Sequence, residues 1–255
     1  MGVQYQFEVR KFPNLPRAPI VEGVLHWQAT ASVDLDESSL RLQLEDKFPG
    51  YSLKSHHDIE AAFTDSPEGV EVKHSKTWKG FRLTKAENDK QVFVCQFKQD
   101  GITFSRLSPY TGWDEFMPYA LEFWRAFVEI CQPKEVARLG ARYISEIPIN
   151  SVEQVGDFIE DVSSPLKVIG IPPRSFFHQD TFDLPGTRYC VNLIRAVQSS
   201  QEDGGNSLIV DIDVFTAKGI DDFQSIETIL SELRYIKNDV FFTVMKDADE
   251  KFKGV

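Results

Sequence analysis

The pattern of apolar and polar positions predicts a chain that alternates between strands and helices. Residues 1–19 hold three prolines and predict an extended lead. The nearly continuous apolar run from Ile20 to Ala31 predicts a strand covered on both faces, and a short helix is expected from Asp36 or Ser38 to Phe48. Residues 51–107 then show an apolar period of two, which predicts an antiparallel meander.

Turn signals divide this meander and set the expected strands. The strands are Asp58–Phe63, Val70–Ser75, Trp78–Thr84, Gln91–Lys98 and Gly101–Leu107, and the turns are Pro67-Glu68-Gly69, Lys79-Gly80, Asn88-Asp89 and Asp100-Gly101. The Asp-Gly pair between two strands is a strong signal for a two-residue hairpin.

The middle of the chain predicts a long apolar helix that leads into a long strand. The helix is expected from Trp113 to Ile130, and the strand from Glu135 to Ile147 with Pro148 as its limit. A short helix (Ser151–Val162), a loop (Ser163–Pro173) and three strands (Ser175–Leu184, Arg188–Gln198, Ser207–Ala217) follow. One helix from Asp222 to Phe252, with a bend at Asn238-Asp239, is expected to end the chain.

This order of elements occurs twice, as strand, helix, meander and helix. Residues 112–116 (GWDEF) and 219–223 (GIDDF) open the second helix of each unit, with glycine at the turn and acids at the positive end of the helix. We therefore expect an α+β fold of mostly antiparallel sheet with packed helices. It would consist of the lead 1–19 and two tandem units, 20–133 and 134–255, packed together as one globular body.

Charge and composition narrow the class of partner. The formal net charge of −11 opposes the approach of a polyanion, so nucleic-acid binding is not expected. The chain has no signal-peptide pattern and no apolar run near the roughly 20 residues of a membrane span. Cys95, Cys131 and Cys190 are far apart in the sequence, which is typical of reduced thiols. We expect a cytoplasmic protein that does not enter a membrane.

Three stretches of the sequence together carry a resemblance to other proteins. They are Leu15–Glu22, Leu107–Tyr110 followed by Trp113 and Phe116, and Arg138–Ile144. Together they resemble a sporadically distributed, functionally uncharacterised prokaryotic family whose members have about this length. The resemblance implies a bacterial or archaeal cytoplasmic protein. A patchy distribution is typical of accessory genes, which implies an accessory, stress, defence or regulatory role; the family supplies no catalytic residues.

Three arginines, Arg106, Arg138 and Arg142, occur in otherwise apolar strands. Arginine is costly to bury unless it is paired, so these side chains predict either internal acidic partners or a site for a small anionic ligand. Glu22, Glu146 and Asp114 are the expected internal partners. Strand alternation puts Glu22 on one face with His26, and Arg138 on one face with Arg142, and these two faces are expected to meet.

Two carboxylates offer an alternative chemistry. Asp211 and Asp213 flank Ile212 in a strand, so both point to the same face and could hold a divalent cation for a metal-assisted hydrolase or nuclease. They could equally be solvated, or pair with Arg188 and Arg195. His56-His57-Asp58, completed by His74 or His178, is a second metal hypothesis, although adjacent strand residues point to opposite faces.

No sequence motif indicates a cofactor or a nucleophile. The chain holds no GxGxxG, Walker A or GxSxG pattern, so we expect no cofactor and assign no catalytic residue. The sequence favours a non-catalytic binding or interaction module over an enzyme. Its ligand would be a protein partner or a small anion at the interface of the two halves, bound by Arg106, Arg138, Arg142 and Glu22; a homodimer is also allowed.

Overall fold

The computed structural model describes residues 4–7, 10–66, 69–87, 90–159, 173–199 and 205–254. The strands are β1 (Ile20–Gln28), β2 (Ser52–Ser66), β3 (Gly69–Glu87), β4 (Lys90–Lys98), β5 (Gly101–Leu107), β6 (Arg138–Ile149), β7 (Phe176–Asp183), β8 (Tyr189–Ser199) and β9 (Asn206–Thr216). The α-helices are α1 (Glu37–Lys47), α2 (Trp113–Cys131), α3 (Val155–Phe158), α4 (Ile226–Val244) and α5 (Ala248–Phe252). Short 3₁₀ turns, Val152–Gln154 and Phe223–Ser225, precede α3 and α4.

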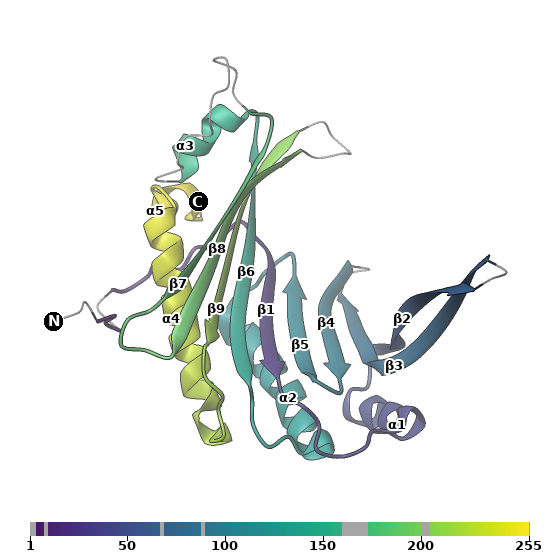
Figure 1. Cartoon of the computed structure of the whole chain (residues 1–255). Coiled ribbons are helices and arrows are strands. Elements are labelled where there is room, and N and C mark those ends of the chain that lie inside the picture. Colours follow the sequence, from purple (N-terminus) through teal and green to yellow (C-terminus); the bar gives the residue numbers. More distant parts are fainter. Residues whose placement is uncertain are drawn as a thin grey trace.

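The nine strands seen in the described residues form one antiparallel sheet. Their order is β2-β3-β4-β5-β1-β6-β9-β8-β7, so β1 and β6 lie side by side at the centre. Figure 1 shows α2 and α4 against one face of this sheet, whereas the middle of the other face is uncovered. The predicted α+β class, with mostly antiparallel sheet and packed helices, is confirmed.

The covered face of the sheet holds the core, because alternation sends the apolar side chains of each strand toward the helices. Leu25 and Trp27 of β1 are fully buried, and Trp27 stacks on Trp124 of α2 with ring centroids 5.8 Å apart. Leu233 of α4 is also fully buried. The core continues across the neighbouring strands through Phe81, Phe97, Phe104, Leu139, Val210 and Val214.

The uncovered face carries the alternate positions of the same strands, and many of them are polar. These positions are Glu22, Val24, His26 and Gln28 on β1, Arg138, Gly140, Arg142 and Ile144 on β6, and Asp211, Asp213 and Phe215 on β9. Of the six predicted site residues, only Arg106 lies elsewhere. The other five lie on one face of the three neighbouring strands β1, β6 and β9.

The meander has longer strands than the sequence predicts. The expected turn at Lys79-Gly80 is wrong, because both residues lie inside β3, where the pairing with β2 shifts near His56 and His57. The strand after α2 also passes its expected limit at Pro148 and ends at Ile149. Pro148 has no backbone donor, but it lies beyond Ser145, the last residue of β6 that pairs with β1. The strand therefore continues through Pro148 by pairing with β9 alone.

The terminal helix is broken, but not where the sequence suggests. The predicted bend at Asn238-Asp239 is wrong, since α4 continues through both residues to Val244. The break falls between α4 and α5, where Asp247 adopts a left-handed conformation with φ of 50°. No helix in the described ranges is both long and apolar enough to cross a membrane.

The short helix predicted at Ser151–Val162 is only partly present. A 3₁₀ turn and α3 occupy residues 152–158, and Ile159 then bridges to Met245. The remainder of the predicted helix, and the predicted loop as far as residue 172, lie outside the described residues.

The two predicted units contribute to a single continuous sheet. On one side of the central β1–β6 pair the strands run β5, β4, β3, β2, and on the other side β9, β8, β7, so the first side has one strand more. The lead crosses the second half, where the Tyr5 amide donates to the carbonyl of Pro185 and the Arg17 amide donates to that of Phe252. This arrangement is compatible with a duplication but does not identify one.

Candidate functional site

The arginines of β6 bind the aspartates of β9 on the uncovered face. Arg142 donates from Nε to both carboxylate oxygens of Asp211, at 2.9 and 3.1 Å, and from Nη2 at 2.5 Å. The side chain of Arg142 is 46% exposed and that of Asp211 only 6%, so the guanidinium shields the carboxylate from solvent. The hydrogen bonds that Arg142 donates to Asp211 raise the pKa of Arg142, so the guanidinium stays charged.

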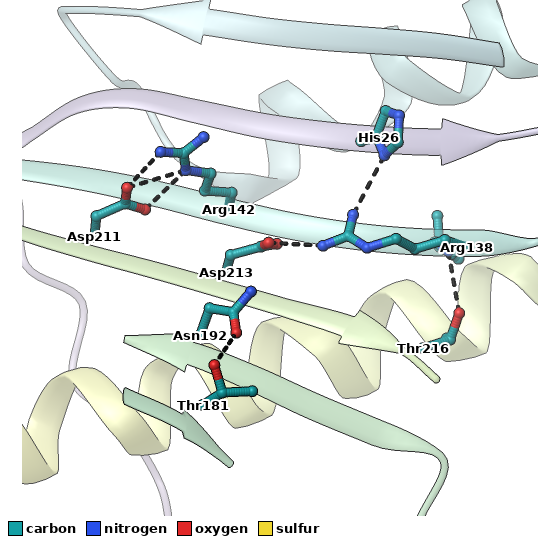
Figure 2. Close-up of polar contacts among 9 residues, drawn as sticks. His26, Arg138, Arg142, Thr181, Asn192, Asp211, Asp213 and Thr216 are labelled. Atoms are coloured by element: carbon teal, nitrogen blue, oxygen red, sulfur yellow. Dashed lines mark hydrogen bonds and ion pairs between the residues drawn. The ribbon is translucent and has the colours of Figure 1, made fainter. Parts of the chain in front are cut away.

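Arg138 forms the second pair and connects it to β1. Its Nη2 lies 2.7 Å from Oδ2 of Asp213, and its Nη1 lies 3.3 Å from Nδ1 of His26 (Figure 2). Its guanidinium carbon also lies 4.1 Å from the ring centroid of Phe215. Arg138 can donate to Nδ1 only while that nitrogen is unprotonated. Burial, helped by the charge of Arg138, lowers the pKa of His26 to about 4, so the imidazole is neutral.

These two pairs are diagonal neighbours in the sheet register. Arg142 stands opposite Asp213 but reaches Asp211 of the adjacent pair. Arg138 passes over Gly140 and its partner Phe215 to reach Asp213. Each carboxylate is thus paired with a guanidinium. Burial raises the pKa of Asp213, and the positive charge of Arg138 opposes this shift. The described residues contain no group of three or more His, Cys, Asp or Glu placed to hold a metal ion.

Glu22 lies beside this cluster without bonding to it. Glu22 stands opposite Ile144, which is the next residue after Arg142 on the same face of β6. The negative charge of Glu22 contributes to the raised pKa of Arg142. The expectation that the Glu22 and Arg142 faces meet is correct, because β1 and β6 pair directly. The expected internal partners of the arginines were wrong, since Asp211 and Asp213 take that role.

Arg106 does not belong to this site, because it points to the covered face. Its side chain is 3% exposed, its guanidinium carbon lies 4.3 Å from the ring centroid of Phe93, and its Nε donates to the carbonyl of Pro109 at 3.2 Å. Nη1 is 3.6 Å from a carboxylate oxygen of Glu87 and makes no hydrogen bond within the described structure. Three arginines that look alike in sequence therefore separate onto opposite faces.

The other predicted polar clusters are also dispersed. Arg195 pairs with Asp180 of β7 rather than with an aspartate of β9. His56 lies 3.6 Å from Asp58, whereas His57 lies opposite Trp78 after the shift in register. The side chain of residue 74 falls outside the described part of the chain.

A polar ladder that the sequence analysis missed extends the site to the edge of the sheet. Asn192 of β8 stands opposite Asp213, and Thr181 of β7 stands opposite Asn192 and donates to its Oδ1 at 2.8 Å (Figure 2). Cys190 of β8 donates to Asp183 of β7 at 3.0 Å on the same face. Polar residues at alternate positions of β7 and β8 were the sequence pattern that could have predicted this ladder.

The covered face holds a second polar cluster that the sequence did not reveal. The hydroxyls of Tyr110 and Tyr143 are 3.0 Å apart, and Lys237 of α4 places Nζ 4.2 Å from the ring centroid of Tyr143. A Cβ at Gly23 would lie 3.0 Å from Tyr110 and 3.2 Å from Tyr143, so a larger residue there would push against both rings. Burial, helped by the charge of Arg234, lowers the pKa of Lys237 to about 7.

The groove found in the structure lies elsewhere. It has a volume of about 710 Å³ and is lined by the β7–β8 turn, the segment after β9 and the start of α4, with Arg188, Lys218, Asp222 and Glu232 among its residues. None of the predicted site residues lines it. The cluster on the uncovered face is therefore separate from this groove.

Comparisons with models of known families, with curated proteins and with solved structures found no match to this chain. The resemblance carried by Leu15–Glu22, Leu107–Tyr110 and Arg138–Ile144 stays a prediction. The ends of these three stretches meet at the centre of the sheet, where Glu22 stands opposite Leu107 on one side and Ile144 on the other.

Proposed function

We propose that this protein is a non-catalytic binding module that receives a partner protein on the uncovered face of its sheet. The supporting observation is the pair of Arg–Asp contacts at the centre of that face. They leave a surface of ordered polar groups with Arg142 exposed, while the opposite face is filled by helices. Exposed polar groups that are already ordered lose little conformational freedom when a partner binds.

A small anionic ligand is the weaker form of this proposal. An anion would have to displace Asp211 from Arg142 or Asp213 from Arg138, and each released carboxylate would then lose its partner in a site that excludes much of the solvent. Arg106, the third member of the predicted anion site, points to the other face. A protein partner can instead bond to the exposed edge of Arg142 and leave the internal pairs intact.

The metal-assisted hydrolase or nuclease is the alternative function. It requires Asp211 and Asp213 to bind a cation together. Each carboxylate instead faces a different guanidinium, which repels a metal ion. A hydrolase would therefore need both ion pairs to break before the metal binds.

The test of this proposal compares substitutions on the two faces. Arg142→Glu changes the charge at the centre of the uncovered face, whereas Arg125→Glu changes an exposed arginine on α2, whose side chain is 68% exposed. A partner captured from cells and identified should be purified and titrated against each variant. We expect Arg142→Glu to weaken its binding at least tenfold and Arg125→Glu to leave it unchanged. Equal binding to both variants would reject the uncovered face as the docking surface.

We also propose that the two halves are tandem units in which β1 corresponds to β6. The strand order about the central pair supports this interpretation, as does the position of residues 112–116 and 219–223 at the start of α2 and before α4. An accessory role in a prokaryotic cytoplasm, in stress or defence, would suit a module that acts by binding. Loss of the gene without any change in a stress or defence phenotype would argue against that role.

A further inference from the structure

The two edge strands of the sheet differ in how they discourage pairing with another chain. Exposed edges of sheets bind other strands unless charges, prolines or irregularities prevent it. On the β2 edge, the exposed side chain of Lys54 and the shift in register at His56 provide such protection. On the β7 edge, residues 176–183 contain no lysine, arginine or proline, and they pair with β8 in unbroken register. Their two acids are engaged within the chain, Asp180 by Arg195 and Asp183 by Cys190.

The β7 edge also carries exposed aromatic rings. Phe177 is 63% exposed and Phe182 is 49% exposed, and together they are two of the four large apolar side chains found exposed in the described residues. They point to opposite faces of the sheet because their positions differ by an odd number. Within the described residues no strand lies beyond β7, so its outer backbone groups have no strand partner there.

We propose that β7 pairs antiparallel with β7 of a second copy of this chain, around a twofold axis at Gln179, so that two sheets join into one. A twofold axis perpendicular to the sheet keeps directly opposed residues on the same face, which restricts the axis to a residue rather than to a gap between residues. With Gln179 on the axis, His178 stands opposite Asp180 of the second copy, and Phe176 stands opposite Phe182 of the second copy.

Neighbouring registers are less favourable. An axis at Asp180 brings two aspartates directly together, and like charges at opposed positions destabilise a sheet. An axis at His178 places Phe176 against Asp180 of the second copy and leaves Phe182 beyond the paired region. The register at Gln179 is therefore the one that places Phe176 against Phe182 and His178 against Asp180, while Phe177 faces Thr181.

The size of this contact predicts a weak dimer. Only eight residues of each chain take part, so the interface belongs to the small class that is typical of transient complexes. We expect dissociation in the micromolar range and a dimer whose fraction rises with protein concentration. His178 faces Asp180 of the second copy, and Asp180 already bonds to Arg195 of its own chain.

Cysteine cross-linking tests the register. Opposed residues in an antiparallel pair have Cα atoms about 4.5–5.5 Å apart, which a disulfide can join. Under mild oxidation Gln179→Cys should yield a covalent dimer, whereas the matched Thr181→Cys, which would face Phe177 of the second copy, should not. The native Cys95, Cys131 and Cys190 are buried, and the unsubstituted protein gives the background.

Sedimentation velocity over a range of concentrations provides the independent measurement. We expect a concentration-dependent dimer that Phe182→Glu weakens at least tenfold, with no loss of folding because the side chain is exposed. A monomer at every concentration would overturn the proposal, as would a dimer that Phe182→Glu leaves unchanged. Equal cross-linking of Gln179→Cys and Thr181→Cys would overturn the register. These substitutions lie three strands away from Arg142, so their outcome is separate from that of partner docking on the uncovered face.

Discussion

The arginines on the two faces of the sheet differ in their burial and in their acidic partners. On the covered face, Arg106 is almost fully buried, lies against Phe93 and has only a distant carboxylate. On the uncovered face, Arg142 is half exposed and holds Asp211 through three short contacts. The difference shows that an arginine in an apolar strand indicates neither burial nor ligand binding by itself. The face to which it points determines its partners.

The largest effect should come from the covered face. Phe123 of α2 is 1% exposed and stacks on Phe48 with ring centroids 3.8 Å apart. Phe123→Ala should reduce the free energy of unfolding by about 3–5 kcal/mol, because it removes buried apolar surface and leaves a cavity. Chemical denaturation monitored by fluorescence measures this loss. A cost below 1 kcal/mol would mean that the helices do not form the core.

The ion pairs of the uncovered face come next. Arg142→Ala leaves Asp211 without its cation in a shielded position, and we expect a loss of about 2–3 kcal/mol in the free energy of unfolding. The double variant Arg142→Met/Asp211→Leu should recover most of this loss, because neither charge remains unpaired. Denaturation of Arg142→Met, Asp211→Leu and the double variant forms the cycle. Additive losses would show that the two side chains do not act as a pair.

The contact between His26 and Arg138 makes stability depend on pH. The pKa of His26 falls from 6.5 to about 4 in the folded state, so the unfolded chain binds the proton more readily between these values. Stability should therefore fall as pH decreases from 6.5 to 4, and this residue should contribute roughly 2 kcal/mol. His26→Gln should remove that part of the pH dependence. An unchanged profile in the variant would assign the acid sensitivity to other groups.

The smallest effect is expected at Lys237, the cation of the covered face. Its pKa of about 7 lies below its ordinary 10.5, so the folded state resists protonation and stability should rise as pH increases from 7 to 10.5. Contact with the Tyr143 ring favours the charged amine and limits the size of this rise. Lys237→Met should stabilise the protein by about 1 kcal/mol at pH 7. Thermal melts of both proteins at pH 7 and 9.5 measure the difference, which should shrink at the higher pH.

Local sequence patterns predicted the class of fold and most elements. The stripe of α2 and the alternation in residues 51–107 depend on local period, which a single sequence contains. The break between α4 and α5 was not predicted, because it coincides with contacts to a distant part of the chain, where Met245 bridges to Ile159 and the Lys246 amide donates to the carbonyl of Phe158. The predicted strands Val70–Ser75 and Trp78–Thr84 are both part of β3, and their continuity was missed because the shift in register at His56 accommodates Lys79-Gly80 without a turn.

The candidate site could be predicted only in part. The alternation rule places Arg138 and Arg142 on one face, and Asp211 and Asp213 on one face, but pairing them requires the knowledge that β6 and β9 are neighbours. Arg106 was grouped with the other arginines because residue type gives no information about which face a strand turns to the helices. The link between β7 and the site through Thr181 and Asn192 depends on register, which the sequence does not specify.

The central claim is that Arg138 and Arg142 are held by aspartates and are offered to a partner protein, not to a small anion. NMR of the arginine Nε–H groups during a titration with inorganic phosphate tests this claim most directly. The structure predicts that the signal of Arg142 keeps its position, since Asp211 occupies Nε, and that it moves when the purified partner is added. A saturable shift of the Arg142 and Arg138 signals with phosphate alone would contradict the claim and support an anion-binding site.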